Sequence, residues 1–294
     1  MFAAIIPVAG RRVIRAHSGA YLHEGWKGAH NMDLGLKGKV AIITGGSDGI
    51  GKAAAESMAR EGARVAIAAR TRETVDAAVA DIEKATGGEV IGIPTDVRDE
   101  EQVKNLVDQV VKKWGGVDIL VNNAGTSSAK KFDELTDDVF SEDFQLKIYG
   151  AIYCIRATLP HMRRAGSGSI VNITTPGGKA SGPGSNPTSM ARAAGISMTK
   201  SLSKEFAPEN IRVNTVCIGL IKSGQHRRRW EAQHARDSSY TLDDHWNSMA
   251  KTVPLGRVGE SAEAGDVIAF LASERAGYVT GASVNIDGGV SPVV

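Results

Sequence analysis

The sequence predicts an α/β fold, a single doubly wound Rossmann-type domain in which a seven-stranded parallel sheet carries helices on both faces. From residue 39 onward, short β-branched runs alternate with longer helical patterns, which is the order of βαβ units. A glycine-rich turn joins the first run to the first helical pattern. With 294 residues, 42% of them hydrophobic, the chain is long enough to bury one large core.

Seven short runs rich in valine, isoleucine and alanine predict the strands. Their nearly continuous apolar character is typical of parallel strands that are covered on both faces. We expect strands at residues 40–44, 64–69, 89–93, 119–122, 169–174, 211–216 and 284–286.

Longer stretches with a helical repeat predict the helices between these strands. In one of them, Val75, Ala78 and Ile82 recur at three- and four-residue spacing, so that one apolar stripe faces the sheet. We expect helices at residues 51–61, 72–86, 100–114, about 137–164 and 191–206.

Two segments depart from this rhythm. Residues 1–31 are rich in arginine and contain a single acidic residue, Glu24. This composition suits a flexible extension, translation begun upstream of the natural start, or a targeting peptide. The dinucleotide-binding domain is then expected at 32–294. Within it, residues 222–252 are polar and contain three consecutive arginines, so we expect either a substrate lid at the carboxyl ends of the strands or a solvated pair of helices.

The overall charge argues for a small-molecule partner. A formal net charge of +2 gives no field strong enough to indicate nucleic acid or a membrane as the main partner. Cys154 and Cys217 are too few for a disulfide framework and have no metal-like spacing, so we expect two buried thiols, no bound metal and a cytoplasmic location.

The segment TGGSDGIG, residues 44–51, predicts a phosphate-binding loop. Glycines let backbone amides approach a pyrophosphate, and the helix that follows adds partial positive charge at its N-terminus. The spacing is not the common G-x-G-x-x-G, but the loop lies between the first strand and the first helix, as such loops do. We expect cofactor contacts from Gly45, Ser47, Asp48, Gly49, Ile50 and Gly51.

The end of the second strand predicts NADP(H) in preference to NAD(H). An acid at this position would bind the adenosine ribose and repel a 2′-phosphate, whereas the sequence has Ala69 followed by Arg70 and Arg72. Arginine matches phosphate geometry with a fork of donors. Asp48 in the phosphate loop argues mildly in the other direction.

Together with this loop, four further motifs resemble those of the short-chain dehydrogenases/reductases: TDV at 95–97, NNAG at 122–125, RVN at 212–214 and the C-terminal PLGRVGE…VNIDGG. The resemblance covers about residues 36–289. It implies homotetramers or homodimers and a pocket for the nicotinamide nucleotide. It assigns cofactor contacts to Asp96, Val97, Asn123, Ala124, Gly125, Arg192, Gly219 and Ile221.

The resemblance also exposes an atypical active site. The family's asparagine, serine, tyrosine and lysine align with Lys147, Thr175, Thr188 and Arg192. Threonine cannot replace the acidic phenol of tyrosine as a proton donor. We therefore expect a desolvated Lys147 to act as the acid, or Lys147 and Arg192 to bind an anionic group, unless Lys147 is an ordinary surface lysine.

Three functions remain open at this point. The first is an NADP(H)-dependent oxidoreductase that interconverts a carbonyl and an alcohol. The second is a catalytically silent nucleotide-binding protein, and the third is a lyase or isomerase that uses the same cleft. The intact phosphate loop is compatible with all three.

Overall fold

The computed structural model describes residues 14–15, 21–22 and 32–294. The chain divides into two units, Met1–Asp33 and Leu34–Val294. In the first unit, β1 (Ile14–Arg15) pairs with β2 (Tyr21–Leu22) in antiparallel fashion. The other residues of the predicted N-terminal extension, including its acid Glu24, lie outside the described residues.

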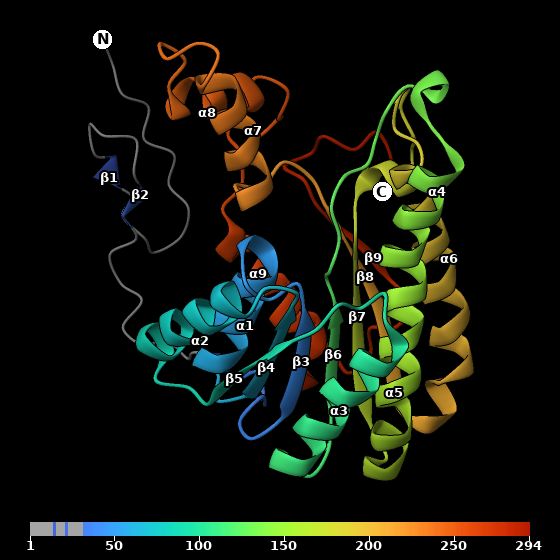
Figure 1. Cartoon of the computed structure of the whole chain (residues 1–294). Helices are drawn as coiled ribbons and strands as arrows, with labels where there is room; N and C mark the ends of the chain where they lie inside the picture. The colour runs from blue at the N-terminus through green and yellow to red at the C-terminus, as the bar shows by residue number, and fades with distance from the viewer. Residues whose placement is uncertain (1–13, 16–20, 23–31) are drawn as a thin grey trace. The chain divides into compact units, whose positions relative to one another are not determined.

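The second unit is built around a parallel sheet of seven strands in the order β5-β4-β3-β6-β7-β8-β9 (Figure 1). Strand β3 pairs with β4 on one side and with β6 on the other, so the order of the strands reverses at β3. Ligands bind at such a switch point in open parallel sheets. The predicted fold class is confirmed. The strands are β3 (Val40–Thr44), β4 (Arg64–Ala69), β5 (Val90–Pro94), β6 (Ile119–Asn122), β7 (Gly168–Thr174), β8 (Ile211–Ile218) and β9 (Ser283–Ile286).

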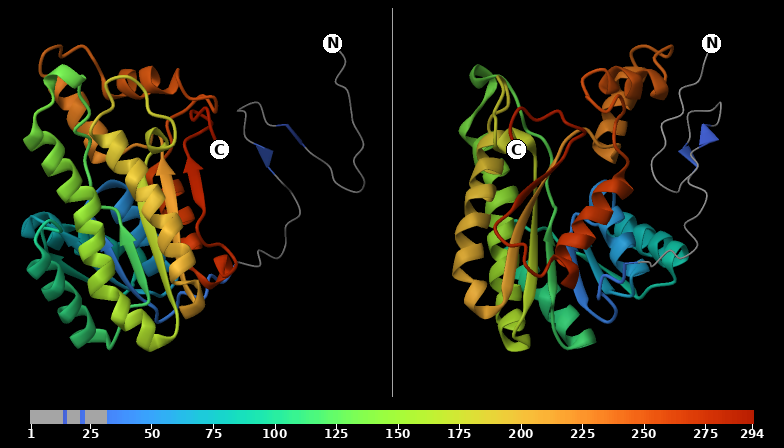
Figure 2. Two further views of the ribbon diagram at one scale, coloured as in Figure 1. Left: turned by 90° about the vertical axis from the view of Figure 1, so that its right-hand side faces the viewer. Right: turned by 180° about the vertical axis from the view of Figure 1, so that it is seen from behind.

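Helices cover both faces of this sheet (Figures 1 and 2). Because side chains alternate along a strand, Ile43 of β3 joins the core on one face and its neighbour Ile42 joins the core on the other. The first face carries α1 (Gly49–Arg60), α2 (Arg72–Thr86) and α9 (Ser261–Ala272). The second carries α3 (Glu100–Trp114), α5 (Gly150–Ala165) and α6 (Thr188–Glu205).

The helix expected at about 137–164 has an interruption that the sequence does not reveal. It consists of α4 (Asp137–Phe144), a π-helical turn η2 (Gln145–Tyr149) and α5. A π-helical turn replaces i→i+4 bonding by i→i+5 bonding over a single turn, which is too short a segment for the helical repeat of the sequence to reveal. Lys147 lies at the middle of this turn.

The insertion at 222–252 forms two helices, α7 (Gly224–His234) and α8 (Leu242–Ala250). They lie beyond the carboxyl ends of the strands (Figure 1). Their aromatic side chains pack on one another, since Trp230 stacks on His234 with 5.0 Å between ring centroids and donates a hydrogen bond to the Tyr240 carbonyl. Among the described residues, no helix is both long and apolar enough to cross a membrane.

Candidate active site

A long groove runs past the carboxyl ends of β3, β4, β5 and β6. Most of the predicted cofactor-binding residues line it. They are Gly45, Ser47, Asp48, Gly49, Ile50, Arg70, Asp96, Val97, Asn123, Ala124 and Gly125. The sequence had not indicated Thr71, Thr74, Gln225 and Arg228, which also line it.

The phosphate loop forms one wall of the groove. Gly45 and Gly49 have φ angles of 65° and 54°, which glycine adopts without steric cost. Asp48 caps α1 without accepting a hydrogen bond from the amides of its first turn, so these amides remain available to an anion. Gly51 faces inward, where a Cβ atom would approach the Gly45 carbonyl oxygen to 2.3 Å. This cradle of amides fits a dinucleotide pyrophosphate.

The Asn123 side chain fixes the shape of that loop. Its amide nitrogen donates to the carbonyl oxygens of Thr44 (2.9 Å) and Gly45 (3.0 Å). In return, the Thr44 hydroxyl accepts from the backbone amides of Asn123 (3.0 Å) and Ala124 (3.1 Å). The ends of β3 and β6 are therefore joined at the switch point, and the groove has a rigid floor.

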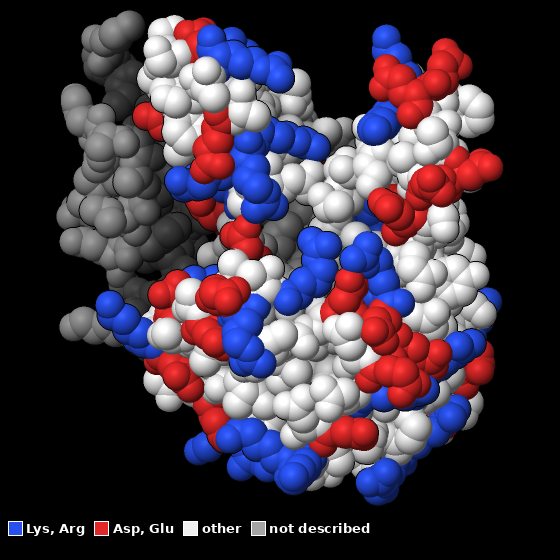
Figure 3. Space-filling model, in the orientation of Figure 1, with Lys and Arg blue, Asp and Glu red and all other residues white. Residues whose placement is uncertain are grey.

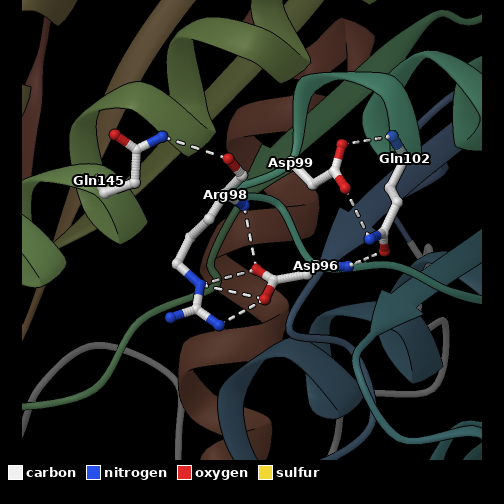
Figure 4. Close-up of polar contacts among 5 residues, drawn as sticks. All are labelled: Asp96, Arg98, Asp99, Gln102 and Gln145. Atoms are coloured by element: carbon white, nitrogen blue, oxygen red, sulfur yellow. Dashed lines mark hydrogen bonds and ion pairs between the residues drawn. The ribbon is translucent and has the colours of Figure 1, made fainter.

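At the far end of the groove, Arg70 and Arg98 flank the Asp96 carboxylate. Arg98 donates from Nε (3.0 Å) and Nη2 (2.5 Å) to Asp96, and its own carbonyl accepts from Gln145 at 3.2 Å (Figure 4). The Arg98 side chain, helped by the charge of Arg70, lowers the pKa of Asp96. Asp96 is thus an ionised acceptor, and Gln145 links this end of the groove to the π-helical turn.

The first turn of α7 closes the groove opposite the phosphate loop. Ser223, Gly224 and Gln225 line it, and Arg228 contacts Asp48. Figure 3 shows the hollow above the groove, with Lys and Arg gathered on the α7 side and charges of both signs on the side of α4. The insertion is therefore a helical pair whose first helix forms part of the groove wall.

Besides Gly51 and Arg192, two further predicted cofactor residues lie away from the groove lining. The Gly219 amide donates to the Ile286 carbonyl at 2.9 Å, and its α-carbon packs against Asp287. Ile221 is buried and pairs with Gly259. Their contact with a cofactor stays a prediction.

A buried pocket adjoins the inner end of the groove and contains Lys147. The Lys147 side chain is 1% exposed and forms an ion pair with Asp143, whose side chain is fully buried. Its Nζ also lies 3.3 Å from Oγ1 of Thr188, which accepts a second hydrogen bond, at 3.0 Å, from the Ser128 amide. Burial, helped by the charge of Arg192, lowers the pKa of Lys147 to about 8, although the contact with Asp143 acts in the opposite direction and raises it.

Arg192 completes this pocket from α6. Its Nη1 donates to the Ile173 carbonyl at 2.6 Å, and its Nη2 lies so near Gly125 that a Cβ there would approach it to 2.8 Å. Burial lowers the pKa of Arg192 to about 10, which leaves it charged at neutral pH. Its Nε is buried without a hydrogen-bond partner.

The structure therefore brings Lys147, Thr188 and Arg192 together, whereas Thr175 lies outside this group. Thr175 is half-buried just after the end of β7, and its neighbour Thr174 lines the pocket. The sequence reasoning missed Asp143. The available signal was its position four residues before Lys147, which is typical of helical ion pairs.

Comparisons with known proteins show that the chain is similar to reductases. A family model described as enoyl-(acyl carrier protein) reductase matches residues 45–291. The chain is 35% identical to the 3-oxoacyl-[acyl-carrier-protein] reductase FabG of Thermotoga maritima, covering 87% of this chain and 98% of that protein.

Two solved structures are also similar. L-sorbose reductase from Gluconobacter frateurii, complexed with NADPH and L-sorbose, has a TM-score of 0.85 and 32% identity, covering 90% of this chain and 100% of that one. A Pseudomonas aeruginosa short chain oxidoreductase, described as containing an atypical catalytic center, was solved with NADPH bound. It has a TM-score of 0.80 and 37% identity, covering 87% of this chain and 98% of that one.

Proposed function

Because this chain belongs to the short-chain dehydrogenase/reductase family, we propose that it is an NADP(H)-dependent oxidoreductase that interconverts a carbonyl and an alcohol on a small molecule. One observation carries the proposal. The groove and the buried pocket adjoin each other, since Val97, Ala124 and Leu146 line both. A dinucleotide along the groove would have its reactive end beside Lys147 and Arg192.

Two observations support NADP(H) as the cofactor. Arg70 lies in the groove directly after Ala69, where an acid would favour the unphosphorylated ribose. The sorbose reductase and the Pseudomonas oxidoreductase were both solved with NADPH. The adenosine end would lie between Arg70 and Asp96.

In reduction, the bound cofactor would supply a hydride to the carbonyl carbon. The proton for the carbonyl oxygen would come from the Lys147 ammonium through the Thr188 hydroxyl 3.3 Å away. Thr188 would pass on its own proton as it takes one from Lys147, so Lys147 is the acid and the threonine only relays the proton. Thr188 accepts hydrogen bonds from both Lys147 and the Ser128 amide, so its own hydrogen is directed elsewhere. A lysine pKa of about 8 suits an acid that works near neutral pH.

Arg192 would stabilise the negative charge that develops on the substrate oxygen. It is a fixed cation in a buried pocket, where a charge acts more strongly than in water. Its unpartnered Nε is a donor available to a ligand. Thr175, which follows the pocket-lining Thr174 in the chain, is a further candidate donor to the substrate.

The test measures turnover of NADPH with a panel of aldehydes and ketones. Turnover is monitored through the absorbance of the reduced cofactor. We expect NADPH loss with at least one carbonyl, and a fall of about 100-fold or more in Lys147→Met and Thr188→Val. Thr188→Ser is the matched control and retains the hydroxyl. Full activity in Lys147→Met would contradict the proposed proton source.

The two alternative functions would give different results in the same assay. NADPH binding without turnover on any carbonyl would favour the catalytically silent protein. Product formation without net loss of NADPH would favour a lyase or isomerase. Failure to bind either nicotinamide nucleotide would overturn the proposal altogether.

A further inference from the structure

We propose that Asp143 is a positioning residue that keeps Lys147 protonated and directed at Thr188. This inference rests on the proposed function, because it assigns Asp143 to the proton path suggested there. Asp143 does not line the groove, so its effect would pass through Lys147, its ion-pair partner, and through its charge on Arg192.

The first argument is burial. The side chains of Asp143 and Lys147 are 0% and 1% exposed and form an ion pair with each other. Moving a carboxylate from water into a protein interior is costly, and hydrophobic residues of similar volume would commonly stabilise the fold better. A buried pair that adjoins the proposed cofactor groove therefore suits a role in the site better than a role in stability.

The second argument is the balance of charge around Lys147. The charged groups that face it are Asp143, from the preceding helical turn, and Arg192, from α6. Desolvation and Arg192 both disfavour the ammonium, and Asp143 is the group that opposes them. Without Asp143 the pocket would hold two cations with no anion to compensate them, so Lys147 would lose its proton more readily.

The third argument is geometry. The π-helical turn places Lys147 so that its Nζ reaches Asp143 on its own chain segment and Thr188 on α6. π-helical turns are rare and occur often at functional sites. The Asp143 contact therefore limits the orientations of a side chain that is otherwise flexible.

The experiment compares Asp143→Asn and Asp143→Glu with Asp138→Asn, an exposed change on the same helix. The rate of carbonyl reduction is measured across pH with saturating NADPH. In Asp143→Asn, we expect the pH above which the rate falls to move down by about one unit or more, because Lys147 loses its compensating charge. Asp143→Glu should restore the profile, and Asp138→Asn should leave it unchanged.

A second readout needs no turnover, so it separates failure of this inference from failure of the proposed function. The pKa of Lys147 is about 8 in the folded chain and has its ordinary value of 10.5 in the unfolded chain. Between these two pH values only the unfolded chain holds the proton, so the free energy of unfolding should rise with pH from about 8 to 10.5. The Lys147→Met variant should lack this rise, so the difference in stability between the wild type and Lys147→Met measures the contribution of Lys147. In the Asp143→Asn background, the rise should begin at a lower pH.

The two readouts can then be compared. A merely structural Asp143 would lower the melting temperature in Asp143→Asn without moving either pH dependence, and that result would overturn the inference. If no carbonyl is reduced but the rise in stability begins at a lower pH in Asp143→Asn, the proposed function fails while the Asp143 effect on Lys147 stands.

Discussion

The Asp48 carboxylate in the phosphate loop lies 3.5 Å from the Arg228 guanidinium of α7. This contact joins the first βα turn to the insertion, two segments far apart in the sequence that both line one groove. It also reduces the negative charge that Asp48 would otherwise present to a pyrophosphate. The mild objection that Asp48 raised against NADP(H) is weakened by this partner.

We predict opposite effects for changes at the two residues. Asp48→Asn removes a negative charge beside the expected phosphates and should tighten NADPH binding, whereas Arg228→Ala exposes that charge and should weaken it. Both side chains are more than half exposed, at 58% and 68%, so each effect should be about twofold to fivefold in the dissociation constant. Isothermal titration calorimetry at two salt concentrations measures it. Equal losses in both variants would contradict this account of Asp48.

Arg70→Ala should separate the two nicotinamide nucleotides. A charge-assisted hydrogen bond to the 2′-phosphate would be lost, so we expect NADPH affinity to fall about 10- to 100-fold while NADH affinity changes little. Arg72→Ala is the matched control, because Arg72 is exposed on α2 and lies 4.0 Å from Asp76. A similar loss of affinity for both nucleotides in Arg70→Ala would show that Arg70 does not read the 2′-phosphate.

Gly51→Ala should damage the phosphate loop. The added Cβ would lie 2.3 Å from the Gly45 carbonyl oxygen and 2.4 Å from the Asn123 side-chain nitrogen, and the first of these is backbone that cannot move aside cheaply. We expect a loss of about 2 kcal/mol or more in unfolding free energy, with weaker NADPH binding. Gly116→Ala is the control, since a Cβ there meets nothing within 4 Å. Chemical denaturation of the three proteins provides the comparison.

The sequence predicts the sheet well because parallel strands covered on both faces leave a strong local pattern. Each expected strand corresponds to an observed one with shifts of at most a few residues at the ends, as between 211–216 and Ile211–Ile218. The glycine loop is predictable for a similar reason, since its geometry excludes side chains at Gly51. These features depend on neighbours in the chain.

The catalytic pocket depends on contacts between distant segments, which local patterns do not contain. The alignment with a known family identifies Lys147, Thr188 and Arg192 as replaced positions, but it does not show the buried Asp143 beside them. The π-helical turn at Lys147 and the Asp48–Arg228 contact also arise from tertiary packing. Arg98 follows Asp96 by two residues, but the sequence alone does not show that it holds that carboxylate.

The pH dependence of the wild-type reaction tests the proposed acid directly. Reduction needs the Lys147 ammonium, and burial lowers its pKa to about 8, so kcat/KM for reduction should be level below that pH and fall about tenfold per unit above it. Oxidation of the alcohol needs the neutral amine, so its rate should rise through the same pH. A tyrosine acid held at an ordinary pKa near 10 would place both changes about two units higher. Steady-state rates in both directions, with pH-jump controls for stability, distinguish these cases, and parallel profiles in the two directions would exclude Lys147 as the group that gives and takes the proton.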